Sequence, residues 1–217
     1  MSRTLASSMI LGCLFSAAAV VTSPPVHAQE VEDAALSNSL YTKHAATPGN
    51  AEIIGLRIDQ DFNAEDHQKI LNAVVVWNYV LNSYIRFEVD RTPFGVPETA
   101  AHEAAEKDTD WIIASEIIAR SKYEARNEVA AETVTLPTGG GMVIVSPHVL
   151  KNVSLENVML HELGHVLGLN HDPRSRLMST EYVLDKQGCV DKVTVETLAK
   201  LKNIEVNELN WCVLPPH

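Results

Sequence analysis

The sequence is short of positive charge, of repeats and of long apolar runs. Lysine and arginine together number 17 against 28 aspartate and glutamate residues, which gives a formal net charge of -11 at pH 7. No lysine- or arginine-rich run offsets this balance, so we expect no nucleic-acid partner and no anionic membrane surface. No period recurs, which excludes collagen, a coiled coil or a repeat array. The 217 residues, 46% of them apolar, suffice for one domain with a single core.

The first 28 residues have the features of an export signal. They carry a single positive charge, residues 9–21 are mostly apolar, and Val26-His27-Ala28 looks like a small-residue cleavage site. The apolar run is too short to span a bilayer with stop-transfer flanks. We therefore expect a signal peptide over 1–28 and a secreted or periplasmic mature chain without an integral membrane segment. The alternative is a lipoprotein site at Cys13, which is disfavoured because the apolar stretch continues past it.

Cysteine is scarce as well. The chain has three cysteines, and Cys13 lies in the expected signal peptide, which leaves Cys189 and Cys212 in the mature chain. In an oxidising compartment we expect this pair to form a disulfide, worth ~3 kcal/mol in the chain-entropy account. The alternative is two free thiols, which exported proteins seldom keep.

Apolar patterning in the mature chain predicts a mixed α/β (α+β) domain. Asn63 can cap a helix that runs to about Asn82, because Ile70, Val74, Trp77 and Leu81 form an apolar stripe at helical spacing. Strands are predicted at 52–58, 84–90, 111–114, 131–136 and 142–145, the last two on either side of a glycine turn.

The remaining segments are predicted to connect these elements. We expect residues 29–50 to be a loose arm, Pro93 and Pro97 to lie in a loop, and residues 100–107 to form a short helix. No segment has the composition of a linker between two domains, so we treat residues 51–217 as one domain.

A helix predicted to start at Ser154 carries two histidines on one face. His161 and His165 are four residues apart, so both imidazoles project to the same side and can bind one ion. Gly168 can leave the helix in a left-handed conformation that a residue with a Cβ resists. The chain can then turn so that His171 supplies a third nitrogen.

Three neutral imidazoles with an open fourth position are typical of a catalytic zinc site rather than of a structural one. Glu162 follows the first histidine, so its carboxylate can take a proton from a metal-bound water. A structural site would not require that carboxylate, and chance would place these five residues at this spacing in roughly one chain in ten thousand. The remaining histidines show no spacing for a second metal site: His44, His67, His102, His148 and His217.

The string His161-Glu162-x-x-His165-x-x-Gly168-x-x-His171 resembles the zinc signature of the metzincin clan. Met178, seven residues after His171, stands where that clan has its Met-turn, and the short gap is similar to that of the matrixin branch. The resemblance implies a twisted mixed sheet of about five strands with a long helix, an active-site helix, a Met-turn and a C-terminal helix near 194–198. It also implies one catalytic Zn²⁺ on the three histidines, Glu162 as the catalytic base and Met178 beneath the metal.

The sequence departs from the matrixin pattern in three respects. No cysteine precedes the site in the mature chain, so a cysteine switch is absent, as in a bacterial-type enzyme. Asp172 directly after the third histidine is more like the adamalysin branch. Tyr182 stands four residues after Met178 rather than two, so no tyrosine ligand is expected. Calcium-binding repeats are missing, and the sequence leaves a structural Ca²⁺ site undetermined.

The sequence thus predicts a secreted, monomeric zinc endopeptidase acting on a protein or peptide substrate. By resemblance, the substrate would lie extended along the strand at 131–136, and residues 178–188 would wall the pocket beside the zinc. Tyr182, Val183 and Leu184 in that wall suggest an apolar preference. Two alternatives stay open: a zinc-fold binding or adhesion protein without turnover, and a zinc amidase acting on a cell-wall peptide.

Overall fold

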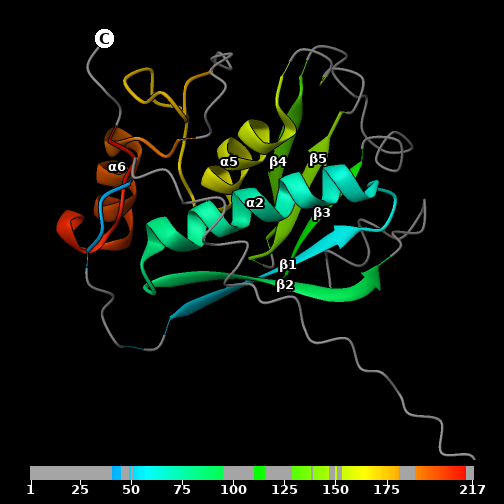
Figure 1. Ribbon diagram of the computed structural model, residues 1–217, viewed down its shortest axis with the longest axis horizontal. Coiled ribbons are helices and arrows are strands. Elements are labelled where there is room, and N and C mark those ends of the chain that lie inside the picture. The colour runs from blue at the N-terminus through cyan, green and yellow to red at the C-terminus, as the bar shows by residue number, and fades with distance from the viewer. Residues whose placement is uncertain are drawn as a thin grey trace, which may run out of the picture.

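Five strands form one mixed sheet in the order β2-β1-β3-β5-β4 (Figure 1). Four strands run parallel to one another: β1 (Glu52–Asp59), β2 (Ile85–Phe94), β3 (Trp111–Ser115) and β5 (Gly141–Val145). Strand β4 (Ala131–Thr135) pairs antiparallel with β5. The mixed α/β fold with about five strands is therefore confirmed. Because β4 ends the strand order, it lies at an edge of the sheet.

The computed structural model describes residues 41–44, 49, 51–94, 110–115, 129–137, 139–146, 150, 153–180 and 189–213. Three predicted features lie wholly or largely outside the described residues: the signal peptide, the short helix at 100–107, and residues 181–188 of the pocket wall predicted at 178–188. None of the described helices combines the length and the hydropathy that crossing a membrane would require.

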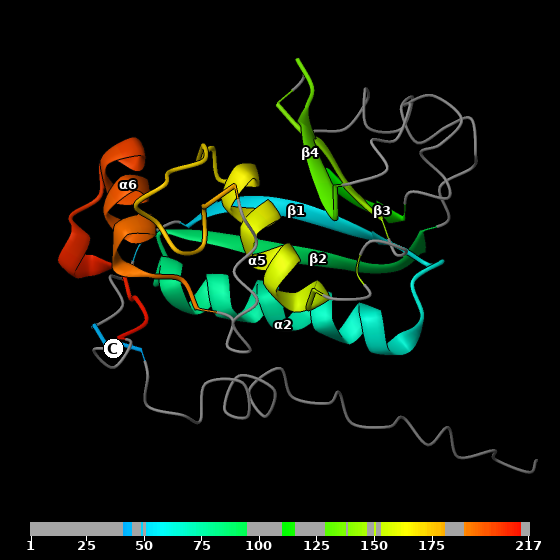
Figure 2. The same ribbon diagram turned by 90° about the horizontal axis from the view of Figure 1, so that it is seen from above.

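Helices α2 (Ala64–Leu81) and α5 (Leu155–Val166) lie side by side on one face of the sheet, and α6 (Lys192–Lys202) stands beyond the sheet at one end (Figures 1 and 2). A short 3-10 turn, η2 (Val206–Glu208), follows α6. Asn63 caps α2 as predicted, because its side chain accepts a hydrogen bond of 2.9 Å from the backbone N–H of Asp66.

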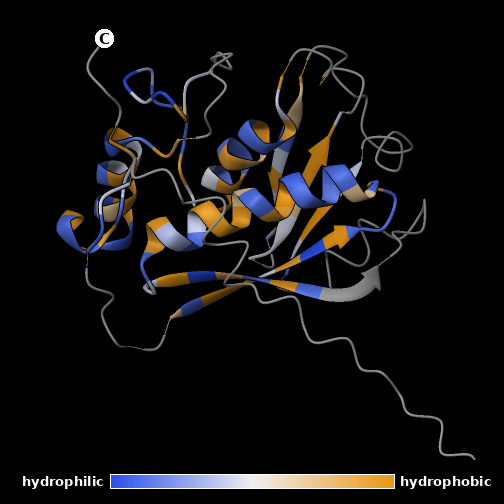
Figure 3. Ribbon diagram, viewed as in Figure 1, coloured by the Kyte–Doolittle hydropathy of each residue, from blue (hydrophilic) through white to orange (hydrophobic). Residues whose placement is uncertain are grey.

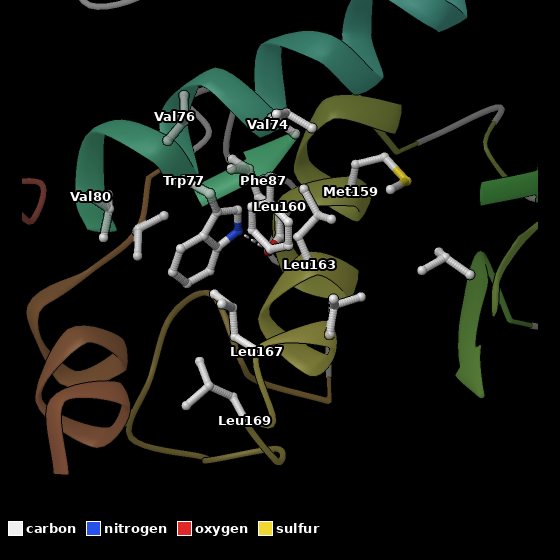
Figure 4. Packing of buried hydrophobic residues seen from close by; sticks show 14 of the residues in the cluster. Val74, Val76, Trp77, Val80, Phe87, Met159, Leu160, Leu163, Leu167 and Leu169 are labelled. Carbon is white, nitrogen blue, oxygen red and sulfur yellow. Dashed lines mark hydrogen bonds between the residues drawn. The ribbon is translucent and has the colours of Figure 1, made fainter. Parts of the chain in front are cut away.

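The core lies between the two helices and the sheet. The central strands β3 and β5 are almost wholly apolar (Figure 3), and all five residues of each are buried. Between the helices, Trp77 packs against Leu160 and Leu163, and its indole N–H donates to the Leu160 carbonyl oxygen at 2.8 Å (Figure 4). This contact fixes α5 against α2 at the residue that precedes the first histidine.

Two predictions differ from the structure in detail. Pro93 was predicted in a loop but lies within β2, which a proline can join because β2 has a neighbour on one side alone in the strand order. Ser154 occupies the N-cap position of α5 but makes no side-chain capping hydrogen bond. The start of this helix is therefore stabilised by the packing of its buried residues. The C-terminal helix is present and extends over Lys192–Lys202.

The start of the described chain contacts its end. Within the predicted arm, Tyr41 forms an antiparallel bridge with Cys212, and the Thr42 N–H donates to the Trp211 carbonyl oxygen at 2.9 Å. Cys212 is joined to Cys189 by the predicted disulfide. Residues 41–44 are thus paired with the C-terminal segment, so the prediction of a loose arm over 29–50 is wrong for these four residues.

Candidate metal centre

Three histidine side chains converge at the C-terminal end of α5. His161 and His165 project from successive turns of the helix, and Gly168, at φ +95°, turns the chain so that His171 returns to them. The Nε2 atom of His161 lies 3.1 Å from that of His165 and 3.2 Å from that of His171, and the third pair is 3.3 Å apart. These nitrogens therefore surround one point, as the sequence predicted.

The far side of two of the rings is held by the backbone. The Nδ1–H of His161 donates to the Leu177 carbonyl oxygen at 2.6 Å, and that of His165 donates to the Leu169 carbonyl oxygen at 2.8 Å. A carbonyl can only accept, so the proton of each neutral ring sits on Nδ1 and the Nε2 lone pair points inward. This tautomer is the one that a metal ion requires, so the residues present fit a zinc ion.

Burial keeps the rings of His161 and His171 uncharged. His161 is 3% exposed, and burial lowers its pKa to about 4, with the neighbouring His165 and His171 adding to the effect. The pKa of His171 is lowered as well, first by burial and then by His165. Both rings are therefore neutral at pH 7, which is the form that can bind a metal.

Glu162 lies on α5 beside the first histidine and is 2% exposed. Its carboxylate oxygen Oε2 accepts a hydrogen bond of 2.6 Å from the hydroxyl of Thr133, on the edge strand β4. The sequence did not single out Thr133, because one threonine in a strand forms no recognisable pattern. The contact depends on the register of β4 and on how α5 packs against the sheet.

Met178 is buried, and its turn is tied to the start of α6. Asp191, the N-cap of α6, accepts hydrogen bonds from the backbone N–H groups of Arg176 at 3.1 Å and Leu177 at 2.9 Å. The Ser175 hydroxyl also donates to Asp191, and it accepts from the N–H of Met178 at 2.8 Å. The sequence did not single out Asp191. Its position before a helix would have indicated a cap, but not this contact with a turn.

A cleft of about 650 Å³ opens beside the three histidines. It lies between the edge strand β4 and the end of α5, and its lining includes Ala131, Glu132, Thr133, Thr135, Glu162, Gly168 and Thr180. A segment of substrate in this cleft would meet the histidines and Glu162 together.

Other predicted residues lie elsewhere. Among the described residues, the three histidines are the one group of His, Cys, Asp or Glu side chains close enough to hold a metal. Asp172 pairs with the exposed guanidinium of Arg174 at 2.6 Å, and this pairing lowers the pKa of its carboxyl. Three of the remaining histidines and the tyrosine at 182 lie outside the part of the chain that the structure describes: His102, His148, His217 and Tyr182.

Comparison with known proteins agrees with the site. A histidine triad beside a buried glutamate is the arrangement expected of a metal centre of the metzincin type. The sequence matches the family model described as Matrixin over residues 44–201, which is more than half of the chain, and the chain belongs to that family.

Among solved structures, the chain is similar to metalloproteinase-II from Bacteroides fragilis, with 15% sequence identity and a TM-score of 0.38. The match covers 71% of this chain and 55% of that one, so the chain spans about half the length of that protein. A search among curated proteins finds no match.

Proposed function

We propose that this protein is a secreted zinc-dependent endopeptidase, with the zinc bound by His161, His165 and His171. The observation that carries the proposal is the convergence of three Nε2 atoms within 3.3 Å of one another, beside the buried carboxylate of Glu162 and open to a cleft. Membership of the matrixin family supports the same activity.

The chain's own groups supply the proton chemistry. A zinc ion bound here contributes Lewis acidity, which makes a water molecule and a peptide carbonyl more reactive. Glu162 takes the proton from the attacking water and returns it to the leaving amine, so the residue acts first as base and then as acid. The carbonyls of Leu177 and Leu169 keep two of the histidines oriented throughout.

The edge strand β4 offers a place for an extended substrate. Four residues of this strand line the cleft, and in the strand order β4 has a neighbour on one side alone. An extended peptide can add to such an edge through main-chain hydrogen bonds, which binds many sequences and leaves selectivity to the side-chain pockets. A substrate bound this way would present its backbone to the three histidines and Glu162. From the residues at 182–184, we propose that the cleft prefers substrates with apolar side chains.

The test is a peptide-library cleavage profile of the purified mature chain, recorded with zinc and with a chelator. We expect chelator-sensitive cleavage within peptides, restored by added zinc and lost in a Glu162→Gln chain that still binds the metal. A chain that binds zinc but cleaves no peptide would instead be a binding protein. Cleavage confined to cell-wall peptides would indicate the amidase. Size-exclusion chromatography of the same preparation checks the proposed monomer.

A further inference from the structure

The edge strand contacts the proposed catalytic base directly. The Thr133 Oγ1 atom lies 2.6 Å from Oε2 of Glu162 and 3.4 Å from the backbone carbonyl oxygen of the same residue. A hydroxyl has one proton to donate, and the shorter contact has the length of an O–H···O⁻ hydrogen bond. The proton therefore goes to the carboxylate.

We propose that Thr133 is a positioning residue that fixes the orientation of the Glu162 carboxylate. The role rests on the proposed function, because Glu162 is the base of that reaction. A carboxylate held at one oxygen keeps one orientation, so the lone pairs that accept a proton point in a constant direction. Both residues line the cleft, where this direction matters.

The geometry of Thr133 suits this role. Its backbone position is fixed by the antiparallel ladder, in which Thr133 stands opposite Val143 of the fully buried strand β5. Its side chain branches at Cβ, which restricts χ1 and holds the hydroxyl in place at little further cost in entropy. The donor is thus preorganised by the sheet, while the acceptor is carried by α5.

The placement also links substrate binding to the chemistry. In the proposed function, the strand to which a peptide adds is β4, and Thr133 lies on that strand. A shift of β4 would therefore move the donor away from Glu162, so the substrate-binding edge and the base are connected by one hydrogen bond. Such a role affects the chemical step more than the affinity for substrate.

The first experiment compares Thr133→Val, Thr133→Ser and the control Thr197→Val in the zinc-loaded chain. Thr197 makes a hydrogen bond within α6 and lies outside the cleft lining. We expect Thr133→Val to lower kcat about tenfold, the size of one charge-assisted hydrogen bond, with KM within about twofold of the parent. Thr133→Ser, which keeps the hydroxyl, should recover most of kcat, and all chains should bind zinc equally by metal analysis.

Three outcomes would overturn the proposal. These are an unchanged kcat in Thr133→Val, a Thr133→Ser chain as slow as Thr133→Val, or a loss of zinc in Thr133→Val equal to its loss of activity. The last would mean that Thr133 supports the fold around the metal rather than the carboxylate.

The second experiment needs no turnover. Urea unfolding midpoints are measured, with zinc saturating, for the parent, Thr133→Val, Glu162→Ala and the double variant. We expect Thr133→Val to shift the midpoint less in the Glu162→Ala background than in the parent, because the partner is already gone. Shifts that simply add would disprove the contact. A parent chain that cleaves no peptide would instead disprove the proposed function, and this cycle would still decide whether the hydrogen bond exists.

Discussion

Two glycines shape the candidate metal centre because they have no Cβ. At Gly168, φ is +95°, in the left-handed region that residues with a Cβ resist, and this turn returns His171 to the helix. At Gly164, a Cβ would lie 2.6 Å from the sulfur of Met178. Gly168, a signature position, is thus needed for the backbone turn, and Gly164, between Glu162 and His165, is needed for packing.

Replacing Gly164 with alanine should destabilise the chain. The added methyl pushes the Met178 sulfur, and overpacking of this kind costs about 1–3 kcal/mol, against a gain in helix propensity of up to about 1 kcal/mol. We expect a net loss in the free energy of unfolding, measured by urea denaturation. The control is Gly49→Ala, where the methyl would meet no atom within 4 Å. Equal stabilities of the two variants would contradict the packing of Met178 against α5.

Substitutions of Glu162 and His165 should separate a loss of catalysis from a loss of metal binding. Glu162→Gln keeps the size of the side chain but removes the base, so turnover should fall by roughly 10²–10⁴ while zinc stays near one equivalent. His165→Ala should lose zinc and activity together, because two imidazoles hold the ion poorly. Metal analysis and peptide cleavage on the same preparations check both. A Glu162→Gln chain as fast as the parent would rule out the proposed mechanism.

At the scale of elements, α6 and the Met178 turn share one carboxylate. Asp191 caps α6 by accepting from the Thr194 N–H at 3.1 Å, and its other oxygen accepts from the N–H of Leu177. Leu177 in turn accepts the hydrogen bond of His161. The start of α6 is therefore two hydrogen bonds away from His161, a proposed metal ligand.

Asp191→Ala should weaken zinc binding as well as the fold. Removal of a buried carboxylate leaves several donors without an acceptor, at ~1–3 kcal/mol each, and frees the Leu177 peptide to move. The control is Asn63→Ala, which removes a similar cap from α2 and should cost ~1 kcal/mol without changing zinc affinity. Urea unfolding and zinc competition with a chelator measure the two effects. Equal zinc affinity in both variants would mean that the hydrogen bonds of Asp191 to the Met178 turn do not contribute to zinc binding.

Patterns along the chain predicted the elements, the histidine cluster and the disulfide, but not the hydrogen bonds between elements. The apolar stripe through Trp77 and the spacing of His161 and His165 each follow from one helix, so the sequence sufficed for these. The hydrogen bond from Thr133 to Glu162 joins residues 29 apart, and that from Ser175 to Asp191 joins residues 16 apart. Such pairs depend on strand register and helix packing, which no local pattern encodes.

For the molecule as a whole, the disulfide and the Tyr41 bridge meet at Cys212. The mature chain should have no thiol that reacts until it is reduced, because Cys189 and Cys212 are paired. Reduction should lower the free energy of unfolding by about 3 kcal/mol. Intact mass after alkylation and urea unfolding with and without reductant provide the measurements. Two reactive thiols in the exported, unreduced chain would contradict the pairing.

The contact of Tyr41 with the C-terminal segment should make the stability of the fold decrease at alkaline pH. Burial raises the pKa of Tyr41 to about 12 from its ordinary value of 10.0, while the Val190 N–H that donates to its oxygen acts in the opposite direction. A raised pKa in the folded state means that the stabilisation is complete below pH 10 and is lost as the pH rises toward 12.

Tyr41→Phe cannot ionise and should therefore lose less stability than the parent between pH 10 and 12. Urea midpoints for both chains across that range give the comparison, in which the ionisation of lysines cancels. Parallel pH profiles would show that Tyr41 is not buried in solution.

The hydrogen bond between Trp77 and the Leu160 carbonyl has an optical consequence. The indole is fully buried between α2 and α5, and the carbonyl that it contacts belongs to the residue before His161. Its fluorescence therefore comes from an apolar site, as does that of the buried Trp111, whereas the partly exposed Trp211 emits from a wetter one. Separation of α5 from α2 would admit water to the Trp77 indole and move its emission to longer wavelength. The protein thus carries its own chromophore for motion of the helix that holds two of the three proposed metal ligands.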